Sequence, residues 1–236
     1  MKFLPALIGI AVLWPLVMGA DTVATGPESL TLDQILRGID QHDRAMSTSL
    51  VRYTCLRRYA LENRRFHKKA EISVRMTYSA PGHKKFEVLS EQGTPILRQR
   101  VLRPMLDAEE ESGRDDVRPH TLIARLNYDF KLLGVQTLQG RATYLVELTP
   151  KTRNKFLIRG RAWVDAGTFG VVRVEAVPAQ SPSIFIHNTR VVQESTRFGA
   201  MWLPLYNHSN TDSFLFGHSE VTIDSWDYKI NGDTGR

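Results

Sequence analysis

Residues 156–177, FLIRGRAWVDAGTFGVVRVEAV, decide the fold of this chain. Along the first half, apolar and polar side chains alternate with the period of two that is typical of a β-strand. Asp165 and Gly167 supply residue types that favour a turn, and the alternation then resumes. We therefore predict a long hairpin with Leu157 and Trp163 on its mixed, arginine-bearing face. The apolar face is predicted to hold Phe156, Ile158, Ala162, Val164, Val172, Val174 and Ala176.

Further strand-like segments lie on both sides of this hairpin. Each alternates between apolar and polar residues and is bounded by turn residues such as Pro81 and Gly82. The segments cover residues 50–61, 70–78, 83–90, 128–135, 141–149, 184–196, 201–211 and 214–228. Together with the hairpin they indicate an antiparallel sheet of roughly ten strands with one apolar face.

Two segments have helical periodicity instead. The first begins at Thr31, because Thr31 and Gln34 have the spacing of a capping box and apolar residues follow at helical intervals up to Leu50. The second covers residues 96–111 and carries an apolar stripe that includes Leu97 and Val101. Pro104 should kink or split this second helix, since proline lacks an amide donor and clashes with the preceding turn.

Two such helices can cover one face of a curled sheet but cannot sandwich it. The predicted fold class is therefore α+β, mainly antiparallel β: a curved, incomplete β-barrel with two or three helices covering the open, apolar side. Such an arrangement favours an apolar cavity between sheet and helices. The many aromatic residues fit either an ordinary core or such a cavity. The candidate lining residues are Leu32, Ile35, Leu36, Ile39, Met46, Met76, Phe86, Leu97, Val101, Phe156 and Ile158.

The first 20 residues have the features of a cleavable signal peptide. Lys2 precedes an apolar run over residues 3–18, and Gly19 and Ala20 are small residues suited to cleavage before Asp21. The alternative is an uncleaved anchor, but the run is short and contains two prolines. We expect an exported, periplasmic protein with a flexible segment at 21–30, one domain at 31–230 and a frayed tail at 231–236.

The charge is unevenly distributed over the chain. Its net charge is +6, and residues 50–106 hold 13 Lys and Arg against four Asp and Glu, whereas residues 107–129 hold three against seven. The basic region suits transient contact with an anionic membrane surface or an acidic partner, although a solvated sheet face explains it equally well. The export signal argues against nucleic acid as a partner.

No catalytic or cofactor-binding motif is recognisable. The chain lacks the patterns of a serine hydrolase, a zinc protease, a phosphate-binding loop and a dithiol site, and its seven histidines have no ligand spacing. We expect a protein that is not an enzyme and that needs no metal or cofactor. Cys55 is the only cysteine, and its place in an apolar strand predicts a buried, inert side chain.

At a broader level, the sequence resembles the LolA/LolB-type periplasmic lipoprotein carriers, in the superfamily that includes RseB-like sensors. The stretches that carry the resemblance are YDFKLLG at 128–134, GRATYLVELTP at 140–150, RGRAWVD at 159–165, VRVE at 172–175 and WLP at 202–204. The resemblance implies an incomplete barrel that binds acyl chains and hands them on without covalent chemistry. Pro104 is a departure that should alter the helix that serves as a lid.

Two functions of different classes follow. In the first, the protein is a carrier that binds acyl chains of lipoproteins or phospholipids and moves them towards the outer membrane, with transfer partners at the inner and outer membranes. In the second, it is an envelope-stress sensor or regulatory protein that uses the same fold to bind a partner protein. A lipid- or glycan-modifying enzyme is a weaker third option, because it would require a cluster of carboxylates or histidines in the cavity.

Overall fold

A computed structural model describes residues 30–181, 186–199, 201–214 and 217–231. The predicted signal peptide, residues 21–29 and residues 232–236 of the predicted tail lie outside the described residues. So do positions 184–185 and 215–216 of the predicted strands. Within the described part, no helix is long and apolar enough to cross a membrane.

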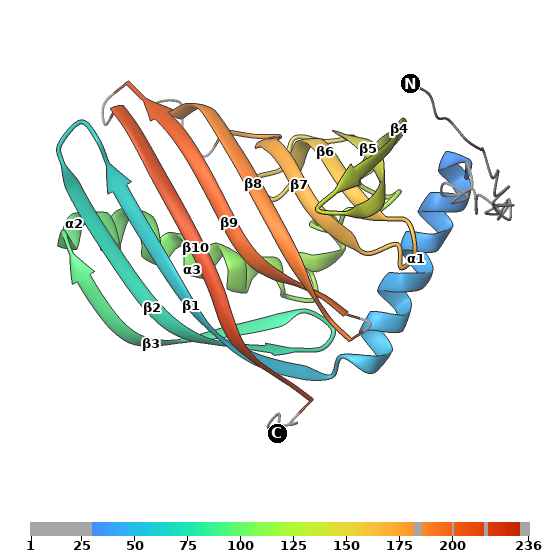
Figure 1. Ribbon diagram of the computed structural model, residues 1–236. Helices are drawn as coiled ribbons and strands as arrows, with labels where there is room; N and C mark the ends of the chain where they lie inside the picture. Colours follow the sequence, from blue (N-terminus) through green and yellow to red (C-terminus); the bar gives the residue numbers. More distant parts are fainter. Residues whose placement is uncertain (1–29, 182–185, 200, 215–216, 232–236) are drawn as a thin grey trace, which may run out of the picture.

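Ten antiparallel strands form a single curled sheet, as predicted (Figure 1). They run in the spatial order β3-β2-β1-β10-β9-β8-β7-β6-β5-β4, so β3 and β4 form the two edges and the barrel does not close. The pairing of β1 with β10 joins the first and the last strand within the sheet. The strands are β1 Arg52–Asn63, β2 Lys68–Ser79, β3 His83–Gly93, β4 Tyr128–Leu138, β5 Arg141–Pro150, β6 Ile158–Asp165, β7 Val171–Pro178, β8 Ile186–Phe198, β9 Met201–Ser213 and β10 Gly217–Ile230.

The first helix, α1 (Leu32–Ser49), begins where the sequence indicated. The hydroxyl of Thr31 accepts a hydrogen bond from the backbone N–H of Gln34, and the Gln34 side chain accepts one from the Thr31 N–H. These two bonds satisfy N–H groups that the first turn of a helix leaves without partners. The helix then crosses one end of the curled sheet (Figure 1).

The second helical segment is divided, as Pro104 predicted. It consists of α2 (Pro95–Leu97), a π-helical turn η1 (Arg98–Leu102) and α3 (Arg103–Ser112). The N–H of Arg103 donates to the carbonyl of Arg98, five residues back, so the turn before Pro104 is widened. This wider turn accommodates the proline without ending the helical path. A short 3₁₀ turn, η2 (Arg118–His120), follows on the way to β4.

The β6–β7 hairpin forms as predicted, but the alternation before it does not hold. Strand β6 begins at Ile158, so Phe156 and Leu157 precede it. Leu157 is 1% exposed, whereas the sequence placed it on the mixed face. Trp163 is buried as well, and its indole N–H donates to the Gln136 side chain on β4. The turn itself follows expectation, since the Asp165 carboxylate accepts bonds from the backbone N–H groups of residues 167 and 168.

Candidate ligand-binding site

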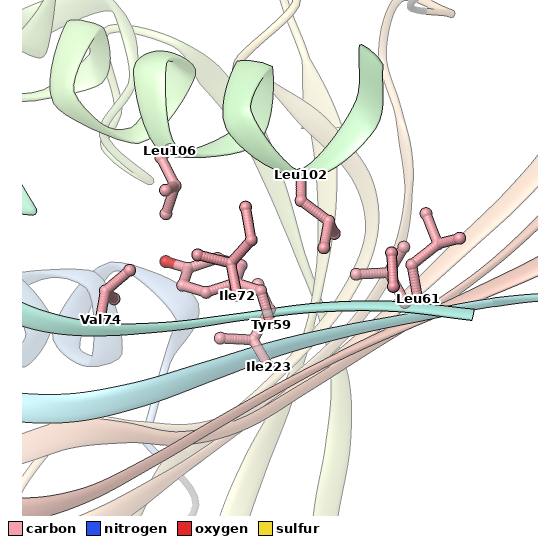
Figure 2. Close-up of a cluster of buried hydrophobic side chains, with 9 residues drawn as sticks. Tyr59, Leu61, Ile72, Val74, Leu102, Leu106 and Ile223 are labelled. Carbon is pink, nitrogen blue, oxygen red and sulfur yellow. The ribbon is translucent and has the colours of Figure 1, made fainter. Parts of the chain in front are cut away.

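The segment α2–η1–α3 covers one end of the concave face of the sheet. Its side chains Leu102 and Leu106 point down onto β1, β2 and β10 (Figure 2). Burying each leucine contributes about 1.5–3 kcal/mol, so this helix is held mainly by apolar contact. We call this group the α3 cluster; it comprises Tyr59, Leu61, Ala70, Ile72, Val74, Leu102, Leu106, Val221 and Ile223, with Phe86, Leu97, Val101 and Met105 packed at its margin.

A buried ion pair ties the same helix to the sheet. Arg57 on β1 is only 5% exposed, and its Nη1 donates to Oε2 of Glu109 on α3 at 2.8 Å. The Tyr59 hydroxyl donates to the other Glu109 oxygen at 2.8 Å, and Lys84 Nζ lies 3.5 Å from the carboxylate. This one carboxylate therefore connects α3 with β1 and β3.

Burial and charge act in opposite directions on this pair. Burial alone would raise the pKa of Glu109, but Arg57 and Lys84 outweigh it and hold the pKa below its ordinary value. Burial alone would lower the pKa of Arg57, but Glu109 raises it well above the ordinary range. Burial also raises the pKa of the Tyr59 hydroxyl, and Glu109 adds to the effect. Both members of the ion pair are therefore charged at neutral pH.

The other end of the concave face is covered by α1. The α1 cluster consists of buried residues from α1, β5 and β6, namely Ile35, Leu36, Ile39, Tyr144, Val146 and Val164. Gly38 lies so close to the β6–β7 turn that a Cβ at this position would be 2.4 Å from Phe169 Cδ1. Only glycine allows this contact between helix and turn.

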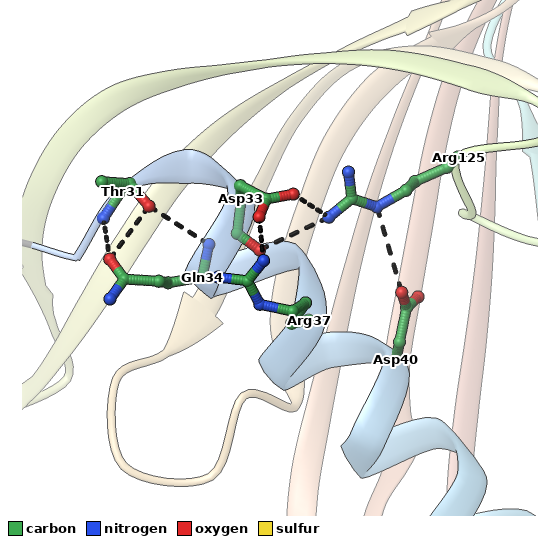
Figure 3. Close-up of polar contacts among 6 residues, drawn as sticks. All are labelled: Thr31, Asp33, Gln34, Arg37, Asp40 and Arg125. Carbon is green, nitrogen blue, oxygen red and sulfur yellow. Dashed lines mark hydrogen bonds and ion pairs between the residues drawn. The ribbon is translucent and has the colours of Figure 1, made fainter.

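Polar contacts fix the exposed side of α1 (Figure 3). Asp33 pairs with Arg37 on the helix and with Arg125 of the segment that leads into β4, at 2.7 Å from its Nη2. The hydrogen bond from Arg125, assisted by the charge of Arg37, lowers the pKa of the exposed Asp33 carboxyl. Arg125 Nε also lies 4.0 Å from Oδ2 of Asp40, which is about two turns beyond Asp33 on the helix.

The last turns of α1 reach back to the strands at the opposite end of the sheet. Met46, on this part of α1, and Leu50, just after the helix, pack against β1, β2 and β9. We call this group the barrel-end cluster; its buried members are Leu50, Tyr53, Cys55, Met76 and Leu203. Cys55 is buried, as predicted, and burial raises the pKa of its thiol. The first half of α1 thus packs on β5 and β6, and its C-terminal end packs on β1, β2 and β9.

The predicted lining residues fall into separate groups rather than one. Leu32, Ile35, Leu36 and Ile39 belong to the α1 cluster, and Met46 and Met76 to the barrel-end cluster. Leu97 and Val101 lie in the α3 cluster, while Phe86 contacts both that cluster and the barrel-end cluster. Ile158 packs in a fourth cluster, around Tyr128 and Leu148. Phe156 belongs to none of these four clusters, and Lys155 Nζ lies 4.7 Å from the centre of its ring. Their role as ligand contacts stays a prediction.

One groove, of about 370 Å³, lies where β1 and β3 end and where β2 and β10 begin. Its charged lining residues are Glu62, Glu71, Glu220 and Lys69, and it contains none of the predicted lining residues. Among the described residues, no three His, Cys, Asp or Glu side chains are placed to hold a metal ion. The groove therefore differs in chemistry from a site for acyl chains.

Sequence reasoning missed Arg57 and Glu109. A usable signal was present, because Arg57 occupies a position on the same face as Tyr53, Cys55 and Tyr59 in a strand whose alternate residues are apolar. A charge on the apolar face of a strand is costly unless a partner is brought to it. The partner lies 52 residues further along the chain, so its identity depends on how the helix docks.

No protein-family model matches the sequence, and no curated protein matches it. Solved structures with a similar course of the chain include a LolA superfamily protein from Nitrosomonas europaea, a member of the group that the sequence resembles. It is 12% identical, with 86% of this chain and 94% of that chain covered and a TM-score of 0.49.

Two further solved structures match at similar levels of identity. A DUF1329 family protein from Desulfovibrio piger is 12% identical, with 89% of this chain and 96% of that chain covered and a TM-score of 0.45. A chain of the MucA/MucB complex from Pseudomonas aeruginosa is 10% identical, with 81% of this chain and 92% of that chain covered and a TM-score of 0.28. The architecture described above rests on the strand order and register of this chain itself.

Proposed function

We propose that this protein is a periplasmic carrier that binds acyl chains of lipoproteins or phospholipids and passes them towards the outer membrane without covalent catalysis. The observation that carries the proposal is the way α2–η1–α3 covers the concave face. An unclosed sheet buries apolar residues under a separate helix. That helix is attached through leucine side chains and several polar contacts, of which those of the Glu109 carboxylate are the least exposed. Displacing it would expose an apolar surface suited to acyl chains.

Acyl chains would be held by the hydrophobic effect. Each buried CH₂ contributes about 0.8 kcal/mol, so a chain of ordinary length can replace the contacts of a docked helix. The basic residues of β1–β3 would meet anionic membrane surfaces during transfer between partners at the inner and outer membranes. No covalent step is needed for binding or release.

A charged side chain under the covering helix tests this proposal. Val101→Asp places a carboxylate at the margin of the α3 cluster, where Val101 is half-buried. We expect uptake of a fluorescent fatty acyl probe to fall by at least about tenfold, because a charge in an apolar site costs more than 1.4 kcal/mol. Circular dichroism of the variant must match that of the wild type.

Ile96→Asp is the matched control, because Ile96 lies on the same helical segment but is 55% exposed. It should leave uptake unchanged. Equal uptake by the wild type and a folded Val101→Asp variant would contradict binding under this helix. If the wild type takes up no acyl probe and instead captures an envelope protein, the sensor function replaces the carrier function.

A further inference from the structure

The concave face is not apolar throughout. Directly opposed residues on antiparallel strands point to the same side of a sheet, so the register defines rows of side chains across it. One row joins Tyr59, Ile223, Asn207, Gln193, Val174, Ala162, Val146 and Leu132, and the next joins Leu61, Val221, Ser209, Val191, Ala176, Gly160, Leu148 and Phe130. In both rows the polar residues occur on β8 and β9 only.

These residues form a continuous polar strip between the two covered ends. Thr211 lies opposite Ser219 and extends the strip along β9, and its hydroxyl contacts that of Thr189 on β8 at 3.2 Å. We define the polar strip as Thr189, Gln193, Asn207, Ser209 and Thr211. All five are half-buried, whereas their row neighbours Ile223 on one side and Val174 on the other are buried in apolar clusters.

The polar strip carries no charge. The opposite face of the same two strands differs, since it holds Arg190, Glu194, His208 and Asp212 at the alternate positions. On the concave side, Arg57 and Glu109 are already paired with each other. Contact with solvent would permit charged residues on either face of these strands. On the concave face, however, the strip consists only of amides and hydroxyls. We therefore infer that the concave face favours uncharged hydrogen-bonding groups.

Side chains of this kind suit one class of ligand group. Amides and hydroxyls can both donate and accept hydrogen bonds, and an anion placed among them would lose its hydration without gaining a counter-charge. Among the described residues, the side chains of Gln193, Asn207 and Ser209 form no hydrogen bond with another residue, so they are available to a ligand. Apolar clusters flank them on both sides.

We propose that the polar strip binds uncharged hydroxyl or ester groups that lie next to the acyl chains of an amphiphile, while the chains themselves occupy the flanking apolar surfaces. This inference rests on the proposed carrier function and specifies its ligand. A sugar head and an acylglycerol head share this chemistry. The sugar and the acylglycerol both have neutral oxygen atoms at the point where the acyl chain begins. The polar strip has neutral hydrogen-bond donors and acceptors at the point where the apolar clusters begin, so the two arrangements match.

Three dodecyl-chain ligands with different heads test the inference: dodecyl glucoside, 1-lauroylglycerol and dodecyl phosphate, each below its micelle concentration. Their affinities are measured by displacement of bound N-phenyl-1-naphthylamine. Two hydrogen bonds to the head correspond to a preference of about tenfold, so at least one uncharged ligand should bind about tenfold more tightly than the phosphate. The ligand that does so identifies the sugar or the glycerol source.

Asn207→Leu should abolish this preference and leave uptake of the apolar probe intact. Asn210→Leu is the matched control, because Asn210 lies on the other face of β9 and its Oδ1 is buried without a partner among the described residues. Ser209→Ala serves as a milder second variant if Asn207→Leu does not fold. It should reduce the preference by about threefold, the effect of losing one such bond.

The outcomes separate the two proposals. If all three ligands bind with equal affinity and Asn207→Leu changes none of them, the polar strip is only a solvated surface and the inference fails, while the carrier function stands. If the folded wild-type protein binds neither the probe nor any dodecyl ligand, the carrier function and the inference fail together.

Discussion

At the scale of single residues, Arg57 and Glu109 decide how firmly the covering helix is held. Removing one member of a buried ion pair lowers the free energy of unfolding by more than the intact pair contributes to it, because the remaining charge stays buried without a partner. Glu109 accepts bonds from both Arg57 and Tyr59, so replacing its carboxylate leaves two buried groups of β1 without this partner. This makes Glu109 the informative position for substitution.

Glu109→Gln should lower the free energy of unfolding by about 3 kcal/mol, since it leaves the Arg57 charge without a counter-ion. Urea unfolding followed by tryptophan fluorescence measures the change. The control is Glu87→Gln, which removes the exposed partner of Arg75 and should cost less than about 1 kcal/mol. Equal effects of the two substitutions would show that the buried pair does not hold the helix.

The same pair predicts a pH dependence. The folded-state pKa of Glu109 lies below its ordinary value of 4.5, so its contribution is present above that pH and is lost as the pH falls through the folded-state pKa. On acidification below about pH 4.5 the wild type should therefore lose stability more steeply than Glu109→Gln. Urea unfolding at several pH values measures the slopes; parallel slopes would contradict the assignment.

At the scale of elements, α1 and the β6–β7 turn fit together at one close contact. Gly38→Ala would place a methyl group 2.4 Å from the Phe169 ring, so helix and turn must move apart. Overpacking of this kind costs about 1–3 kcal/mol, although alanine is the better helix former. Thermal unfolding should therefore show a lower midpoint for Gly38→Ala.

The Phe169→Leu substitution provides the check on this cause. Combined with Gly38→Ala it should recover part of the lost stability, because the smaller side chain makes room for the added methyl group. If the two single substitutions are simply additive, the loss arises from another source than this contact.

Element boundaries and types were largely predictable from the sequence, and the exceptions have physical causes. The capping box at Thr31 and the effect of Pro104 depend on residues within a few positions, so local reasoning sufficed. Leu157 was misplaced because strand alternation does not apply to the two residues before β6 begins. The pairing of Arg57 with Glu109 depends on helix docking over a long sequence distance, which no local pattern contains.

At the scale of the whole molecule, the unclosed sheet and its two helical covers were predictable, but the division of the concave face was not. Asn207 and Gln193 lie next to each other only because of the β8–β9 register. The predicted lining residues are likewise distributed by register and docking among the α1, α3 and barrel-end clusters. Alternation predicts which residues share a face along one strand, and not what the neighbouring strands place beside them.

The central claim is that the protein carries acylated cargo, and the most direct test is mass spectrometry of organic extracts from protein purified from its native envelope without detergent. Phospholipid or acylated peptide should be present in a near-stoichiometric amount. Extraction of the Val101→Asp variant, prepared in the same way, should yield much less. A native protein that contains no lipid would contradict the carrier function and direct attention to a protein partner.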